Sequence, residues 1–106
     1  MNTAYFYLTD EGGKLAHKLA TAHPGDIYNK ENFKENLRAG FGKYDSLVCI
    51  MATGIVVRIL APLIVHKTSD PAVVVLDQKG KHAISLLSAH LGGVSAKAVV
   101  HVKSRC

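Results

Sequence analysis

The stretch SLVCIMATGIVVRIL, residues 46–60, decides the fold. Its first six residues form a continuous apolar run, which is typical of a strand buried on both faces of a parallel sheet. A glycine turn follows, and Ile55 and Ile59 then lie four residues apart, which is helical spacing. Pro62 would obstruct a central strand, so we expect a buried helix over residues 53–60. The stretch therefore predicts a strand, a turn and a helix in direct succession.

Two further units of the same kind precede this stretch. Residues 4–8 (AYFYL) and 26–29 (DIYN) have the composition of strands. Thr9 or Asp10 can cap a helix that follows the first strand. After the second strand an apolar stripe predicts a helix that Gly42 ends: Phe33, Leu37 and Phe41.

A hairpin is predicted after the stretch. Residues 72–77 (AVVVLD) and 82–87 (HAISLL) flank a short loop in which Gly80 is expected to take a positive φ. Three strand–helix units and one hairpin indicate an α/β fold with three layers, α/β/α. The sheet is expected to be mixed and mostly parallel, with about five strands including one antiparallel hairpin. We expect a single domain over residues 1–106.

Composition limits the classes of partner. Thirteen Lys and Arg against eight Asp and Glu leave a net charge of +5, which suits an anionic partner or serves solubility. The basic residues are scattered, which argues against nucleic acid, and no apolar run is long enough to cross a membrane. The N-terminus lacks the pattern of a secretory signal, so a cytoplasmic protein is expected, with Cys49 and Cys106 as thiols. The histidine spacing predicts no metal site.

Two turns are candidates for anion binding. Thr53-Gly54 and Gly92-Gly93 each stand where a strand is expected to pass into a helix, and helix starts present unpaired N–H groups. We expect both turns at the same edge of the sheet, beyond the strand ends. Arg58 could add a bidentate contact if it faces that cleft. The alternative is that Gly54 only permits close packing and Arg58 is a solvated surface residue.

His90 stands immediately before the second of these turns. A helix start would lower the pKa of the imidazole and keep it available as a neutral base or donor. Ser85 and Ser88 could orient it, but no nucleophile motif surrounds either serine. The alternative is a structural histidine.

Read together, residues 52–93 resemble the N-terminal domain of the CbiG family of cobalamin biosynthesis proteins, the cobalt-precorrin-5A hydrolases. The resemblance rests on three blocks in order: G-I-V-V-R-x-L-A-P, S-D-P-A-V-V-V-x-D and G-x-x-x-I-S-L-L-S-x-H-x-G-G. Residues 1–45 agree in layout. The chain departs from the family after Gly93, where VSAKAVVHVKSRC replaces the usual Ala-Asn and leucine-rich helix.

The resemblance implies an enzyme of the anaerobic cobalamin pathway. It would open the lactone of cobalt-precorrin-5A, release acetaldehyde and leave cobalt-precorrin-5B. The substrate is a tetrapyrrole that brings its own cobalt, so no separate cofactor is implied. Family members carry a further C-terminal domain, so we expect either a partner chain that supplies it or a truncated protein.

Lactone opening requires an activated water and donors for the carbonyl oxyanion. We assign His90 as base or acid, and the Gly92 and Gly93 amides as donors. Substrate carboxylates would be held by four residues: Thr53, Gly54, Arg58 and Ser88. An alternative function is a non-catalytic module that binds a tetrapyrrole or another anion within a larger assembly. A nucleotide-binding domain is disfavoured because phosphate-loop fingerprints are missing.

Overall fold

The strands and helices expected from the sequence are present in the computed structural model, which describes residues 2–64 and 70–87. The helix predicted over residues 53–60 has those bounds, and each predicted strand agrees with the observed one to within a residue at either end. In chain order the elements are β1 (Thr3–Tyr7), α1 (Asp10–Ala22), β2 (Asp26–Tyr28), α2 (Phe33–Phe41), β3 (Ser46–Ile50), α3 (Thr53–Leu60), the 3₁₀ helix η1 (Ala61–Leu63), β4 (Ala72–Leu76) and β5 (Ala83–Leu87).

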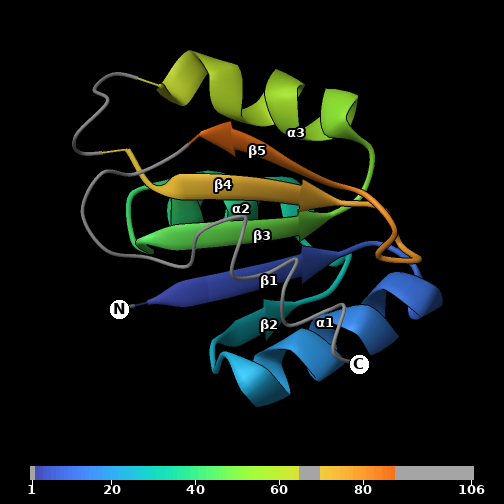
Figure 1. Cartoon of the computed structure of the whole chain (residues 1–106). Helices are drawn as coiled ribbons and strands as arrows, with labels where there is room; N and C mark the ends of the chain where they lie inside the picture. Colours follow the sequence, from blue (N-terminus) through green and yellow to red (C-terminus); the bar gives the residue numbers. More distant parts are fainter. Residues whose placement is uncertain (1, 65–69, 88–106) are drawn as a thin grey trace.

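The strands form one mixed sheet with the order β2-β1-β3-β4-β5. The first four strands are parallel, and β5 alone runs antiparallel to its neighbour β4. Figure 1 shows the arrowhead of β5 pointing opposite to that of β4. Both the α/β fold class and the antiparallel hairpin are confirmed.

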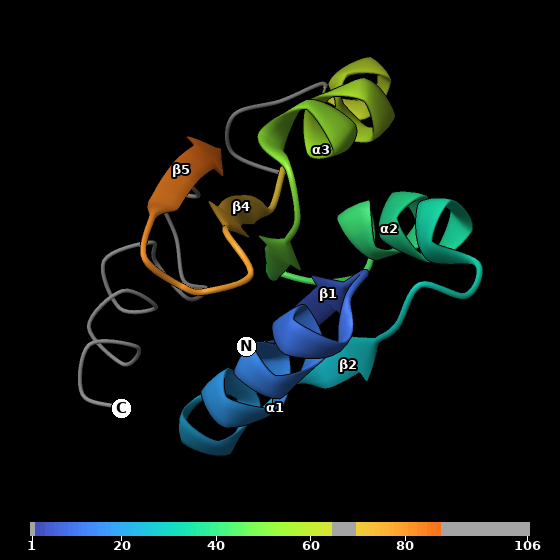
Figure 2. The ribbon, with the colours of Figure 1, turned by 90° about the vertical axis from the view of Figure 1, so that its right-hand side faces the viewer.

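The helices cover the sheet unequally. Figure 2 shows α1 on one face and both α2 and α3 on the other. Parallel connections are right-handed, so the face that a helix covers follows from the direction in which the chain moves along the sheet. The chain moves one way from β1 to β2 and the other way from β2 through β3 to β4. This reversal places α1 opposite α2 and α3, and it produces the three expected layers.

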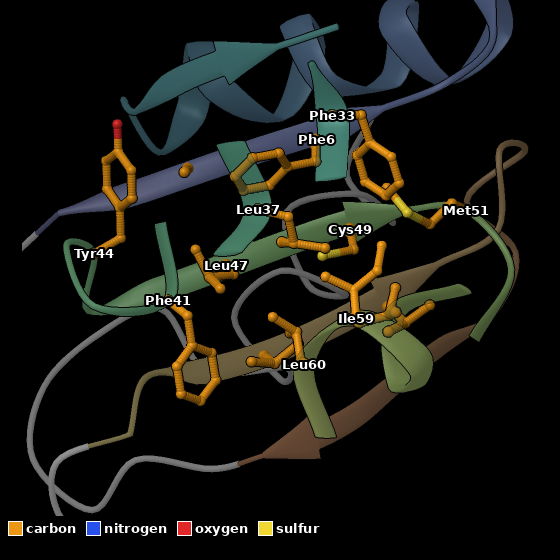
Figure 3. Packing of buried hydrophobic residues seen from close by; sticks show 14 residues of the cluster. Phe6, Phe33, Leu37, Phe41, Tyr44, Leu47, Cys49, Met51, Ile59 and Leu60 are labelled. Atoms are coloured by element: carbon orange, nitrogen blue, oxygen red, sulfur yellow. The ribbon is translucent and has the colours of Figure 1, made fainter. Parts of the chain in front are cut away.

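The larger part of the core lies between the sheet and the α2 and α3 helices. The predicted stripe of α2 is buried there, with Leu37 fully inaccessible to solvent. Figure 3 shows α2 and α3 side chains meeting those of β1 and β3. A smaller cluster under α1 is built around Tyr5, Leu19 and Val48. Strand β3 contributes to both clusters, as its continuous apolar sequence predicts.

The expectation that residues 53–60 form a buried helix holds for only one side of that helix. Val56 and Ile59 are buried against the sheet, whereas Val57 is 43% exposed and Arg58 is exposed. The helix is apolar on its outer side because of Val57, so composition alone overstates its burial. In residues 2–64 and 70–87, no helix is both long enough and apolar enough to span a bilayer.

Two local predictions agree with the structure. Thr9 caps α1, since its hydroxyl oxygen accepts a hydrogen bond from the Gly12 N–H at 3.0 Å. Gly80 takes a φ of 71° in the hairpin loop, a region that favours glycine. The Asp77 carboxylate closes this loop by accepting from the Lys81 N–H at 2.7 Å.

Consecutive side-chain hydrogen bonds hold the short edge strand β2 in place. Tyr44 donates to the Asp26 carboxylate at 2.5 Å, and therefore Tyr28 donates to the Tyr44 oxygen at 2.6 Å. The Tyr28 ring also stacks on Phe6 with the centroids 5.0 Å apart. Burial, together with the bonds to Asp26 and Tyr28, raises the pKa of the Tyr44 phenol. These contacts compensate for the small number of ladder bonds that three residues can make.

Cys49 is a free, fully buried thiol in β3, and we expect it to lower the stability of the fold at alkaline pH. Burial raises its pKa from 9.0 to about 12. Above about pH 9 the unfolded chain loses a proton that the folded chain keeps, so the free energy of unfolding falls as the pH rises. The slope contributed by this thiol approaches about 1.4 kcal/mol per pH unit only well above pH 9, so its loss between about pH 8 and about pH 10 totals about 1.4 kcal/mol. Urea titrations between about pH 8 and about pH 10 will measure it.

Cys49→Ala is the control for this measurement. It should lower stability at neutral pH by about 1 kcal/mol through lost packing. Between about pH 8 and about pH 10 it should lose about 1.4 kcal/mol less than the wild type, and a smaller loss remains because the pKa values of Tyr5 and Tyr44 are also raised. Equal pH dependence in the two proteins would show that Cys49 does not cause the loss of stability. Cys106 lies outside the described residues.

Candidate functional site

The carboxyl ends of β1 and β3 mark the point at which the strand order reverses. The connection after β1 crosses one face toward β2, whereas the connection after β3 crosses the other face toward β4. Because the two connections diverge, a crevice opens between them, and ligands of open α/β sheets bind at such a crevice. Figure 2 looks onto this edge of the sheet, with α1 and α3 leaving it in different directions.

A hollow of about 320 Å³ occupies this position. The Thr9 hydroxyl donates to the Gln78 side-chain oxygen at 2.9 Å, which ties the loop after β1 to the loop after β4. Apolar side chains from the ends of β1 and β3 form the floor, and polar groups form one rim. The lining residues are Leu8, Thr9, Ile50, Met51, Ala52, Ile55, Asp77 and Gln78. We call this hollow the strand-end crevice.

Thr53 and Gly54 begin α3 directly beside this crevice. Ala52 is the N-cap residue, and no side chain of the described residues caps the helix start. A Cβ added at Gly54 would have no atom of the described residues within 4 Å. The explanation that Gly54 permits close packing is therefore wrong, because the space beside it is open. The geometry leaves this helix start accessible to a ligand.

Arg58 lies one turn further along α3 and lines a second hollow, of about 420 Å³, between α2 and α3. Two cations of α2, Lys34 and Arg38, line the same hollow. Its remaining lining is apolar and is contributed by Leu8, Phe33, Ile55 and Ile59. We call this hollow the basic groove. Arg58 is exposed and faces this groove, and it does not line the strand-end crevice, which is the cleft that the sequence interpretation requires it to face.

Sequence reasoning missed Lys34 and Arg38. They are four residues apart on α2 and so lie on one side of that helix, next to the buried stripe that includes Phe33. That spacing was readable, but two cations on a helix are more often solvated. Only the packing of α2 beside α3 (Figure 2) brings them to the groove that Arg58 lines.

The second predicted turn requires a correction. Because β5 is antiparallel, its last residue, Leu87, pairs with Val73 near the amino end of β4. The chain therefore leaves β5 at the edge opposite to Thr53, and the expectation that both turns begin at the same edge is wrong. The antiparallel hairpin itself requires this outcome. Ser88, His90, Gly92 and Gly93 lie outside the described residues, and their roles stay predictions.

The described residues offer little for metal chemistry. No group of three His, Cys, Asp or Glu side chains within residues 2–64 and 70–87 is placed to hold a metal ion. Buried Cys49 faces the core and not the crevice or the groove, neither of which it lines. What the described site combines is an open helix start, an apolar floor and three cations.

Three comparisons with known proteins bear on this arrangement. The chain is 45% identical over 105 aligned residues to the cobalt-precorrin-5A hydrolase of Salmonella typhimurium, a match that covers 88% of this chain and 30% of that protein. It is 49% identical over 55 residues to the protein of the same name from Priestia megaterium, covering 52% of this chain and 15% of that one. The chain thus spans less than a third of the length of these relatives.

A solved structure shares the fold. The crystal structure of a cobalamin biosynthesis protein G homologue from Sulfolobus solfataricus superposes with a TM-score of 0.80 at 21% identity. The match covers 97% of this chain and 34% of that one. At this identity the likeness concerns the fold alone.

The family comparison matches residues 35–102 to the CbiG N-terminal domain, described as "Cobalamin synthesis G N-terminal". The matched range includes β3, α3 and the β4–β5 hairpin, together with Arg38 and Arg58 of the basic groove. It covers well over half of the chain, and the chain therefore belongs to the CbiG N-terminal family.

Proposed function

We propose that this chain supplies the substrate-binding crevice of a cobalt-precorrin-5A hydrolase in cobalamin biosynthesis. The reaction is hydrolytic opening of the substrate lactone with release of acetaldehyde, giving cobalt-precorrin-5B. The observation that carries the proposal is the 45% identity to a relative of that name across 88% of this chain. The strand-end crevice supports it, since it lies where ligands of such sheets bind.

The role assigned to the described residues is to bind the negatively charged carboxylates of the substrate. Peripheral carboxylates of the tetrapyrrole would meet the open start of α3 at Thr53 and Gly54, where the helix dipole favours negative charge. Arg58 adds a fixed positive charge one turn away. Cobalt arrives within the substrate macrocycle, so the protein itself does not need to hold it.

For the hydrolytic step we assign His90 to activate water, with the amides of Gly92 and Gly93 as donors to the oxyanion. Ser88 would help to hold the substrate. These residues follow β5, and they would have to meet the substrate from a turn that begins at the opposite edge of the sheet. The assignment is therefore a hypothesis to be tested directly.

The test is to mix the 106-residue chain with cobalt-precorrin-5A and to measure acetaldehyde. The proposed function requires acetaldehyde from the wild-type chain and at least a hundredfold less from His90→Ala, an effect of the size expected for loss of a general base. Equal turnover in the two proteins would remove His90 from catalysis. Circular dichroism should be the same for both, since the comparison requires the same fold.

A non-catalytic tetrapyrrole-binding module is the second candidate, and one observation favours it. The described residues that line the strand-end crevice and the basic groove include no histidine, serine or cysteine. A module of this kind would bind the substrate while other parts of a longer protein supply catalysis. Binding of cobalt-precorrin-5A by this chain without any acetaldehyde would support the module over the hydrolase.

A further inference from the structure

The basic groove between α2 and α3 combines two properties that a single ligand must satisfy. Its floor is apolar and includes Phe33 and Ile59, which belong to the core. Its rim carries three cationic residues, all of which are exposed: Lys34, Arg38 and Arg58. Among the described residues that line the groove there is no carboxylate. The groove therefore presents unbalanced positive charge above an apolar surface.

This charge arrangement points to an anionic ligand. Lys34 and Arg38 lie one helical turn apart, and like charges at that spacing repel one another and destabilise a helix slightly. Arg58 lines the same groove from the neighbouring helix. A ligand with two or more carboxylates would relieve the repulsion, and arginine binds carboxylates through paired N–H groups.

The apolar floor restricts the ligand further. A small inorganic anion would satisfy the cations but would leave the partly buried side chains of Leu8 and Ile55 in contact with water. A ring system that is apolar on its face and carries carboxylates at its rim would satisfy both at once. The groove also shares Leu8 and Ile55 with the strand-end crevice. One ligand could therefore extend from the groove into the crevice at the start of α3.

We propose that the basic groove binds the carboxylated rim of a tetrapyrrole macrocycle. Arg38 and Arg58 pair with peripheral carboxylates, Lys34 adds a third positive charge, and the ring packs on the partly buried Leu8 and Ile55. This inference rests on the proposed function for the identity of the macrocycle. It adds α2 to the substrate site. It also assigns a binding role to Lys34 and Arg38, which the packing of α2 beside α3 brings to the groove.

The probe is uroporphyrin I, a soluble tetrapyrrole with a carboxylate on every side chain, titrated into the chain by fluorescence. Arg38→Met/Arg58→Met should weaken binding about a hundredfold, which corresponds to about tenfold for each lost carboxylate pair. Binding by the wild-type chain should weaken as salt is added, and the double variant should lose most of that salt dependence. Arg38→Lys/Arg58→Lys should restore only part of the affinity, because it keeps both charges but loses the paired N–H contacts.

The matched control is Lys14→Met/Lys18→Met. It also removes two positive charges, but both lie on α1, which covers the opposite face of the sheet (Figure 2). Its affinity for uroporphyrin I should stay within about threefold of wild type if the site is local and not a consequence of net charge. Equal losses in the control and the arginine variant, or unchanged affinity in the arginine variant, would overturn the groove proposal.

The groove and the hydrolase proposals fail in different ways. If the chain releases acetaldehyde from cobalt-precorrin-5A and Arg38→Met/Arg58→Met does so with an unchanged KM, the groove is wrong and the hydrolase stands. If uroporphyrin I binding depends on Arg38 and Arg58 while no acetaldehyde forms, the groove stands and the hydrolase proposal for this chain is wrong.

Discussion

Phe6→Ala is expected to lower the free energy of unfolding by about 4 kcal/mol, the usual range for truncating a buried phenylalanine. Phe6 is completely buried near the carboxyl end of β1, within the larger core cluster. Its ring stacks on Tyr28 of β2, and a Cβ added at Gly40 of α2 would come within 3.3 Å of its outermost carbon. Removal of the ring therefore leaves a cavity between the sheet and α2.

Urea unfolding followed by circular dichroism measures this loss. Val57→Ala is the matched control because it also truncates an apolar residue, but one that is 43% exposed. Its cost should be about 1 kcal/mol or less. A cost for Phe6→Ala that is no greater than that of the control would show that the ring is not packed as the structure places it.

Gly25→Ala is expected to cost about 3 kcal/mol, at the upper end of the range for overpacking. An added Cβ would approach the backbone carbonyl oxygen of Thr3 to 2.4 Å. That oxygen belongs to β1 and cannot rotate away as a side chain can. Either β2 moves off β1 or the chain before it changes course, and both outcomes disturb the pairing of Ala4 with Asp26.

Gly54→Ala makes the same chemical change where the space is open. It should leave stability unchanged or raise it by up to about 1 kcal/mol, since alanine is the better helix former. Thermal unfolding of the two variants side by side gives the comparison. If Gly25→Ala were as stable as Gly54→Ala, the close approach of β2 to β1 at Thr3 would be wrong.

The local parts of the fold were predictable because each depends on a few neighbouring residues. The bounds of α3 follow from a glycine turn, isoleucine spacing and Pro62, and the positive φ of Gly80 follows from its place in a short hairpin loop. The stripe of α2 was likewise readable from the spacing of Phe33 and Leu37. Helical and strand periods leave a direct trace in the sequence.

The candidate site was predicted only in part. Thr53 and Gly54 lie beside the strand-end crevice, whereas Arg58 lines the basic groove. The resemblance to the CbiG family is confirmed by the comparisons. The expectation that the turn after β5 begins at the same edge was wrong. Because β5 runs antiparallel to β4, it ends beside the amino end of β4, at the opposite edge. Lys34 and Arg38 were missed because they line a groove only when α3, about twenty residues further along the chain, packs beside α2.

The sequence by itself determined the kinds of element, most of their bounds and the family, because caps, turns and apolar periodicity act over a few residues. Tertiary structure alone decided that the strand order reverses between β1 and β3 and that Lys34, Arg38 and Arg58 share one groove. The reason is physical: strand order depends on pairing between distant segments, and the handedness of each connection then selects the face that each helix covers. A cation on α2 meets a cation on α3 only after both helices have been placed on the same face.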